Sequence, residues 1–508
     1  MPELDADVIV IGAGPTGLML AGELRLNGVQ VLVLDRLAEP MQQSRALGFS
    51  ARTIEEFDQR GLLPRFGTVD TIPVGHFGGL PIDFRVLEGG SYGARGKPQS
   101  MTEGILAGWA GGLGAEVRRE QQVTGLSQPD DPADPVEVQV EGPQGPQTLR
   151  ARYVAGCDGA RSTVRRALDI PFPGTDATIE MWFADVAGLQ LRPRFSGERV
   201  PGGMVMVLPM GPQVSRVVVY ERGARRRTDG PPSFEEVAAS WNRLTGEDIS
   251  AGKPLWTSYT TDASRQAEQY RKGRAFLLGD AAHIHLPVGA QGMSAGIGDA
   301  VNLGWKLAAV LKGQAPDDLL DTFHQERHPV GARILTNTLA QRTLYLSGDE
   351  MDPLREVMGE LLAYESVQKL LVGMVTGLDI RYEVGGPEHP LLGRRVPDAP
   401  LGASADGPAR VFDLLRSGQG VLLNLGEPVA VAGGWSGRVK VLDLPATEIE
   451  GLPGVHRVLI RPDGYIAWVA DGPQTEGLAE ALTRWFGEPG AGLPDAELVT
   501  AASASPIR

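Results

Sequence analysis

Three glycines and one acidic residue near the start of the chain have the spacing of a dinucleotide-binding turn. Gly12, Gly14 and Gly17 form a GxGxxG pattern directly after the β-branched run at residues 7–11. Asp35 follows at the roughly 20-residue distance typical of such folds. The glycines allow a tight turn and let a pyrophosphate approach the backbone N–H groups of a helix N-terminus, where the helix dipole favours an anion. Asp35 would accept hydrogen bonds from a ribose, but the pattern does not distinguish FAD from NAD.

The elements that position these residues can be read from the same stretch. Residues 7–11 and 29–34 are predominantly apolar runs, which predict buried parallel strands. Between them Leu18, Ala21 and Leu24 recur at helical spacing up to the stop signal Asn27-Gly28. The sequence therefore predicts a βαβ unit, and an α/β fold with a Rossmann-like domain.

Two later motifs add to this pattern. They are CDGARS from Cys157 and GDAAH from Gly279, the second following an apolar run at residues 274–278. With the GxGxxG pattern in the same order, they resemble the DG and GD motifs of the class A flavoprotein monooxygenases, the family of para-hydroxybenzoate hydroxylase. The resemblance implies non-covalent FAD, with Asp280 on a ribityl hydroxyl and Asp158 where flavin and nicotinamide meet.

The resemblance also implies a set of cofactor-binding residues. Arg45 and Gln99 match family positions that contact the cofactor. The complete set that we expect to bind FAD is Gly12, Gly14, Pro15, Thr16, Gly17, Asp35, Arg36, Arg45, Gln99, Val123, Asp158, Gly159, Gly279, Asp280, Gly292 and Met293.

A glycine-containing loop, PVGAQGM from Pro287, leads into a predicted helix that ends at about residue 311. Its glycines would let the backbone approach a flavin, and the helix N-terminus would stabilise negative charge on the reduced ring. We expect Pro287, Gly289, Gln291, Gly292 and Met293 to face the flavin. No residue pattern identifies a catalytic base.

Four further segments narrow the resemblance. They are HFGGLPIDF from His76, PGGMVMV from Pro201, AHIHLPVGAQGM from Ala282 and DAVNLGWKL from Asp299. They are similar to the aromatic polyketide hydroxylases, and most similar to the angucycline hydroxylases. The resemblance implies a monooxygenase of antibiotic biosynthesis that uses NADPH or NADH and O2 to hydroxylate an angucyclinone-type aromatic polyketide through a flavin C4a-hydroperoxide.

The predicted domains follow from this pattern and the resemblance. Residues 1–174 and 271–390 form a discontinuous FAD-binding domain, and the short β pieces near 75–100 belong either to it or to the substrate domain. Residues 175–270 form a β-rich substrate domain. Residues 395–487 fit the thioredoxin-like domain of the subfamily, without redox activity because Cys157 is the one cysteine, and 488–508 form a flexible tail.

Large side chains on the predicted strands are candidates for the substrate wall. They are Phe77, Trp182, Met204, Tyr220 and Trp256. Strand alternation turns only some of them toward one face, so each fits the core as well as a binding site.

Composition excludes several classes of function. A net charge of −15 over 508 residues opposes nucleic-acid binding. No apolar run is long enough to cross a bilayer and no leader precedes the first strand, so we expect a cytoplasmic protein, with a homodimer possible in principle. His283, His285, His324 and His328 lack the partners of a metal site, so no metal is expected.

Alternatives remain open at this point. A Baeyer–Villiger oxygenase acting on a polyketide ketone would use the same motifs. An NAD-dependent dehydrogenase would share the GxGxxG pattern, and so would a cofactor-bound structural protein without turnover.

Overall fold

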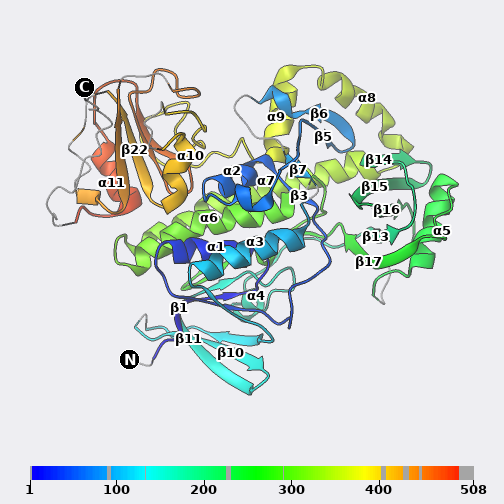
Figure 1. Ribbon diagram of the computed structural model, residues 1–508, viewed down its shortest axis with the longest axis horizontal. Coiled ribbons are helices and arrows are strands. Elements are labelled where there is room, and N and C mark those ends of the chain that lie inside the picture. The colour runs from blue at the N-terminus through cyan, green and yellow to red at the C-terminus, as the bar shows by residue number, and fades with distance from the viewer. Residues whose placement is uncertain are drawn as a thin grey trace, which may run out of the picture.

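The computed structural model describes residues 3–87, 93–95, 97–131, 133–224, 230–289, 291–401, 408–426, 429, 434–445 and 449–490. These residues form three parts, two of which we name after the role expected from the sequence. The nucleotide-binding part contains the GxGxxG turn, the substrate sheet is formed by strands between residues 180 and 261, and the C-terminal part begins at about residue 408. The C-terminal part and the substrate sheet lie on opposite sides of the nucleotide-binding part (Figure 1). Of the tail predicted at 488–508, residues 491–508 lie outside the described residues. The mixed α/β fold class expected from the sequence is confirmed.

The nucleotide-binding part is built on an eight-stranded sheet. Its parallel centre is β1 (Ala6–Ile11) between β2 (Val31–Leu34) and β11 (Gly145–Gly156). β8 (Glu116–Arg118) and β20 (Ala275–Leu277) extend it in parallel at either side. β19 (Arg271–Lys272), β10 (Val136–Gly142) and β9 (Gln122–Ser127) add antiparallel pairs. β20 joins this sheet although the whole substrate sheet lies between it and β11 in the sequence.

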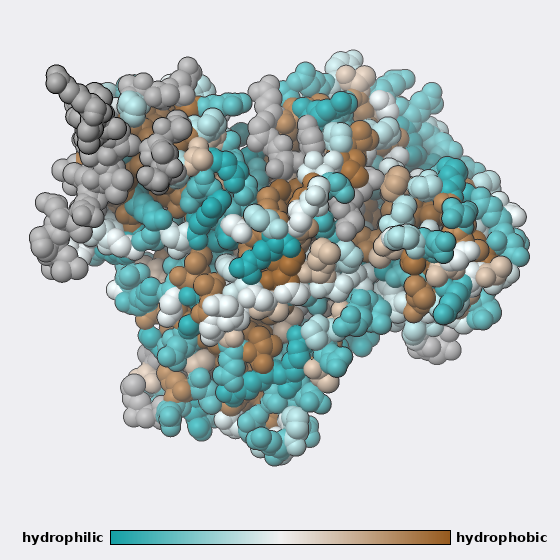
Figure 2. Space-filling view, in the orientation of Figure 1, coloured by the Kyte–Doolittle hydropathy of each residue, from teal (hydrophilic) through white to brown (hydrophobic). Residues whose placement is uncertain are grey.

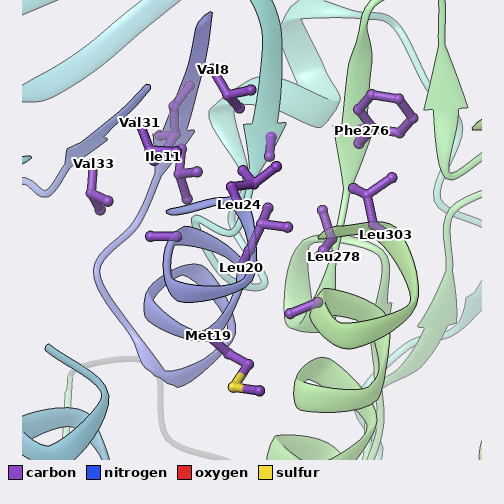
Figure 3. Close-up of a cluster of buried hydrophobic side chains, with 14 of the residues drawn as sticks. Val8, Ile11, Met19, Leu20, Leu24, Val31, Val33, Phe276, Leu278 and Leu303 are labelled. Atoms are coloured by element: carbon purple, nitrogen blue, oxygen red, sulfur yellow. The ribbon is translucent and has the colours of Figure 1, made fainter. Parts of the chain in front are cut away.

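Three helices pack against one another beside this sheet: α1 (Pro15–Leu26), α3 (Gln99–Gly112) and α6 (Gln291–Leu311). Close packing needs glycine, since a Cβ at Gly22 would lie 2.0 Å from the Trp109 ring and one at Gly304 would lie 2.5 Å from Glu23. Leu20 and Leu24 of α1 and Leu303 of α6 belong to the same buried core, part of which Figure 3 shows. Each such buried side chain contributes about 1.5–3 kcal/mol of transfer free energy.

The substrate sheet is antiparallel, with five strands in the order β14-β15-β16-β13-β17. Their bounds are β13 (Glu180–Ala187), β14 (Arg194–Val200), β15 (Gly203–Gly211), β16 (Val214–Glu221) and β17 (Lys253–Thr261). α5 (Phe234–Thr245) begins with a capping box between Ser233 and Glu236 and buries Trp241 against one face. The other face carries Met181 and Val218 toward the nucleotide-binding part.

Several helices and short strands lie outside these two sheets. They are α2 (Ala51–Asp58), α4 (Thr163–Ala167), α7 (Asp321–Leu346), α8 (Asp352–Leu361), α9 (Glu365–Thr376), the hairpin β5 (Val74–Phe77) with β6 (Leu80–Asp83), the sheet of β3 (Gly48–Phe49), β7 (Gly93–Arg95) and β4 (Thr71–Ile72), and the sheet of β12 (Gly174–Thr175), β18 (Ser264–Gln266) and β21 (His283–Ile284). Sequence analysis did not identify α8 or α9. The β5–β6 hairpin packs on α9 rather than on either large sheet.

The C-terminal part has a four-stranded sheet in the order β23-β22-β24-β25. β22 (Gly420–Leu425) runs parallel to β23 (Val439–Leu444) and antiparallel to β24 (Arg457–Ile460), which pairs with β25 (Ile466–Ala470). α10 (Val411–Leu414) precedes the sheet and α11 (Leu478–Phe486) covers it. This order and these directions are those of the thioredoxin-like fold expected from the resemblance.

The outer surface in Figure 2 carries polar side chains over all three parts, with apolar residues in smaller areas between them. None of the described helices is long and apolar enough to span a membrane.

Candidate functional site

A cavity of about 850 Å³ lies between the nucleotide-binding part and the substrate sheet. Its wall combines the start of α1, the segment 45–51, the start of α6, the β5–β6 hairpin and one face of the substrate sheet. The sequence-predicted residues in this wall are Gly14, Pro15, Thr16, Arg45, Gln99, Gly159, Asp280, Pro287, Gly289, Gln291, Gly292 and Met293. The fold therefore brings together residues from separate stretches of the chain.

Glycine is present at the three positions of the GxGxxG turn for different structural reasons. Gly12 has φ +107°, and a Cβ there would lie 2.4 Å from the carbonyl oxygen of Cys157. A Cβ at Gly17 would lie 2.0 Å from the carbonyl oxygen of Gly12. A Cβ at Gly14, in contrast, would have no atom of the described residues within 4 Å apart from those of its chain neighbours, although this residue caps α1 and lines the cavity. The open space at Gly14 fits a bound pyrophosphate.

Asp35 lies at the end of β2, facing the turn. Its carboxylate accepts hydrogen bonds from Ala13 N at 2.7 Å and Leu37 N at 2.8 Å. These contacts hold the carboxylate where a ribose would follow the pyrophosphate. Of the other residues predicted here, Arg36 is exposed beside Asp35 and Val123 is buried in the sheet core, and neither lines the cavity.

The DG and GD motifs both lie close to the segment that begins α1. Asp158 accepts hydrogen bonds from Thr163 N at 2.6 Å and Val164 N at 3.3 Å, and its Oδ1 is buried without a hydrogen-bond partner among the described residues. Burial raises the pKa of this carboxyl above its usual range. Asp280 is exposed and lines the cavity. The start of α6 approaches α1 closely, since a Cβ at Gly296 would lie 2.2 Å from Thr16 Oγ1.

The orientation of the Gln291 side chain at the start of α6 is fixed by a ladder of amides. Gly78 N donates to Gln341 Oε1 at 3.2 Å, Gln341 Nε2 donates to Asn337 Oδ1 at 3.0 Å, and Asn337 Nδ2 donates to Gln291 Oε1 at 3.0 Å. Because a backbone N–H begins the ladder, none of its amides can be reversed without two donors meeting. This ladder joins the β5–β6 hairpin to the start of α6 and so to the loop that precedes it.

A buried ion cluster lies behind this loop. Asp299 Oδ2 lies 2.8 Å from His283 Nε2 and accepts from Gly279 N at 3.0 Å, while its Oδ1 accepts from Arg327 Nε at 2.7 Å. Arg327, His283 and these hydrogen bonds outweigh the burial of the carboxyl and hold its pKa at about 2. The cluster fixes the GD motif to α6 and α7.

The lowered pKa of Asp299 predicts a loss of stability in acid. A carboxyl with an unfolded pKa of 3.8 and a folded pKa of about 2 stabilises the fold fully above pH 3.8, and this contribution disappears as the pH falls to about 2. We expect about 2 kcal/mol of unfolding free energy to be lost over that window through this group. Urea unfolding from pH 5 to pH 2.5 should show a flatter profile for Asp299→Asn than for the wild type. Parallel profiles would contradict the assignment.

The five side chains proposed for the substrate wall lie outside the cavity. Trp182 lies on the α5 side of the sheet, Met204 and Tyr220 are packed in the core near Tyr345, Phe77 is buried against α9, and the Trp256 ring lies under the Arg216 guanidinium. The same strands line the cavity with Met181, Phe183, Met206, Leu208, Met210, Arg216, Val218 and Thr260. Met181 and Phe183 flank Trp182, so the strand was identified correctly but alternation turns the adjacent side chains inward.

Sequence analysis gave His285 no catalytic role. Its Nδ1 lies 2.8 Å from the carbonyl oxygen of Leu286, and its Nε2 has no hydrogen-bond partner among the described residues. His285 lines the cavity, and burial lowers its pKa below the usual range. The ring is thus neutral near pH 7, with Nδ1–H donating to Leu286 and Nε2 left as an acceptor. Within the described residues, no group of three or more His, Cys, Asp or Glu could hold a metal ion.

Comparisons with known proteins agree with this geometry. Residues 5–338 match the family described as FAD binding domain, and residues 389–489 match that described as aromatic-ring hydroxylase, C-terminal. The chain is 44% identical over 512 aligned residues to the 12-dehydrotetracycline 5-monooxygenase/anhydrotetracycline 6-monooxygenase of Streptomyces rimosus, covering 95% of this chain and 99% of that protein. It is 42% identical to the rifampicin monooxygenase of Streptomyces venezuelae, covering 96% and 100%.

A solved structure is also similar. The chain superposes on CabE, an aromatic hydroxylase from angucycline biosynthesis, with a TM-score of 0.90 and 54% identity, covering 96% of this chain and 100% of that one. The match to an FAD binding domain decides between the two dinucleotides that the GxGxxG pattern left open.

Proposed function

Because the chain belongs to the FAD-dependent aromatic-ring hydroxylases and is a flavoprotein monooxygenase, we propose that it hydroxylates an angucyclinone-type aromatic polyketide in antibiotic biosynthesis. NADPH or NADH is the proposed electron donor and O2 the oxidant. The relatives whose names specify tetracycline, rifampicin and angucycline chemistry support a polycyclic substrate.

The observation that carries this proposal is the cavity between the cofactor loops and the substrate sheet. Its volume of about 850 Å³ is in the upper range of small-molecule sites and includes the space beside the flavin-facing loop. Met181, Phe183 and Met206 give the sheet side an apolar wall. Flat apolar walls and flexible thioethers suit a fused-ring substrate and exclude water from it.

The residues present fit FAD. The start of α1 with the open space at Gly14 would hold the pyrophosphate, Asp35 the ribose and Asp280 the ribityl chain. FAD supplies the activation of O2 when it is bound and reduced. The chain contributes the N-terminus of α6, whose backbone N–H groups and dipole stabilise negative charge at this side of the cavity.

His285 is the proposed proton acceptor for a phenolic substrate. Its ring is held through Nδ1, and the remaining nitrogen, which is buried in the cavity wall, is the basic one. Since burial lowers its pKa, the ring is neutral near pH 7 and takes up a proton only while the phenol loses one. An electron-rich phenolate is the form that aromatic hydroxylation requires.

The experiment that tests this proposal combines a spectrum with turnover. The purified protein should show flavin absorption bands, and a purified angucyclinone should strongly stimulate oxygen-dependent NADPH oxidation and gain one oxygen atom in mass. Retention of every carbonyl signal in the product separates hydroxylation from a Baeyer–Villiger reaction. A colourless protein that shows no turnover after FAD is added would contradict the proposal.

A further inference from the structure

The turn between β24 and β25 of the C-terminal part is buried in the nucleotide-binding part. Arg461 and Asp463 are 0% and 1% exposed, although both lie in a charged turn with the sequence RPDGY. Arg461 pairs with Glu326 of α7, and Asp463 Oδ2 accepts from Trp305 Nε1 of α6 at 3.2 Å. A turn of this composition normally lies on the surface. Its burial indicates that it is a contact element between the two parts.

Arg52 connects this turn to α2. Its Nη2 donates to the carbonyl oxygen of Asp463 at 2.8 Å, and its Nη1 donates to Glu55 Oε2 at 2.9 Å. The guanidinium lies 4.9 Å from the centre of the Tyr465 ring, and its Nε lies 3.5 Å from Glu56 Oε1. Arg52 is 4% exposed. The planar guanidinium therefore fixes α2 relative to the turn in both distance and orientation.

Arg52 is also next to the cavity wall. It is the second residue of α2, and Ser50 and Ala51 before it line the cavity. Ser50 N donates a hydrogen bond to Ser294 Oγ of α6 at 3.0 Å. A Cβ at Gly377, the residue after the cavity-lining Thr376 of α9, would lie 3.4 Å from Arg52 Cβ. Arg52 thus belongs to one wall element, contacts the C-terminal turn and lies beside the end of a second wall element.

We propose that Arg52 is a positioning residue for the cavity, through which the C-terminal turn sets the wall formed by the start of α2 and the end of α9. The C-terminal part then acts on the reaction without contacting the reacting atoms. This inference rests on the proposed function for its effect on turnover. The geometric part of the inference, that Arg52 holds the wall in place, does not depend on the proposed function.

Arg60 provides a matched control. Its Nη2 donates to the carbonyl oxygen of Pro462 in the same turn at 2.9 Å, its Nε pairs with Glu23 at 2.5 Å, and it is buried. Arg60 does not line the cavity. Arg60→Lys and Arg52→Lys remove the same kind of contact, because an ammonium keeps the charge for the carboxylate partner but cannot also present the planar fork to the turn.

The experiment compares Arg52→Lys, Arg52→Met and Arg60→Lys as FAD-loaded full-length proteins at temperatures that give equal fractions folded. Hydrogen exchange is followed in peptides covering residues 45–58 and 370–378. Turnover is measured as kcat, KM and the fraction of NADPH oxidised that ends as hydrogen peroxide. We expect Arg52→Lys to speed exchange in both peptides and to raise KM and the peroxide fraction several-fold, with Arg52→Met more severe. Arg60→Lys should leave the 370–378 peptide and the peroxide fraction unchanged.

Each outcome decides the proposal. Equal effects of Arg52→Lys and Arg60→Lys would mean that the turn contributes only stability, and unchanged exchange at 370–378 in both Arg52 variants would overturn the positioning role. If Arg52→Met does not fold, the two lysine variants still give the comparison. If the wild type shows no turnover, the proposed function fails while the exchange data still decide whether Arg52 holds the wall.

Discussion

Gly14→Val is expected to weaken FAD binding by at least about a hundredfold while leaving the fold intact, which corresponds to about 3 kcal/mol of binding free energy. The reason is that Gly14 has φ −77°, a conformation open to any residue, and that among the described residues none but its own chain neighbours lies within 4 Å of a Cβ at this position. An added side chain therefore meets only the bound pyrophosphate. Titration of the apoprotein with FAD, followed by flavin fluorescence, measures the loss.

Gly12→Ala is the control for this prediction. Its Cβ would meet the carbonyl oxygen of Cys157 at 2.4 Å with φ at +107°, so it should lower the melting temperature even without FAD. Gly14→Val should change the stability of the apoprotein by no more than about 1 kcal/mol, since valine is a poorer helix cap than glycine. An unchanged FAD affinity in Gly14→Val would place the pyrophosphate elsewhere.

Arg461→Met is expected to cost about 3–5 kcal/mol of unfolding free energy, because it leaves buried carboxylates without their main counter-charge. Arg461 donates to Glu326 Oε1 at 2.6 Å and to Asp463 Oδ1 at 3.1 Å. Lys306 would remain beside Glu326, at 2.8 Å. The loss should appear in urea unfolding at pH 7, with the C-terminal part separating first.

Arg192→Met tests whether burial of the ion pair causes the loss of unfolding free energy expected for Arg461→Met. Arg192 also pairs with a glutamate, Glu198, at 2.5 Å, but its side chain is 63% exposed. Solvent screens exposed pairs, so they contribute little, and this variant should have an unfolding free energy close to that of the wild type. A similar loss in both variants would mean that the pairing, rather than the burial of Arg461, sets the cost.

The nucleotide-binding turn could be predicted from the sequence because all of its information is local. The strand at 6–11, the glycine turn and the helix that begins at Pro15 are consecutive, so residue type and spacing determine their geometry. The same holds for the start of α6, which follows the GD motif within twelve residues. Recognition of FAD and of the family followed from these segments.

The substrate wall could not be predicted in this way. Strand alternation identified the sheet but not which of its faces meets the cavity, so Trp182 was chosen where Met181 and Phe183 line the site. α8 has no buried residue, and its helical pattern gives no core signal. His285 was recognised as part of a motif, but its free nitrogen became evident only from the hydrogen bond made by the other one.

The sequence by itself predicted the βαβ unit, because consecutive residues with fixed local geometry encode it. Its motifs implied FAD and a thioredoxin-like C-terminal part only through the resemblance to a known family. Only the tertiary structure decided which side chains form the cavity and how the C-terminal turn contacts α2 beside it. Those contacts join residues hundreds of positions apart, such as Arg52 and Asp463. Their partners are set by how the three parts pack together, and no local spacing records that packing.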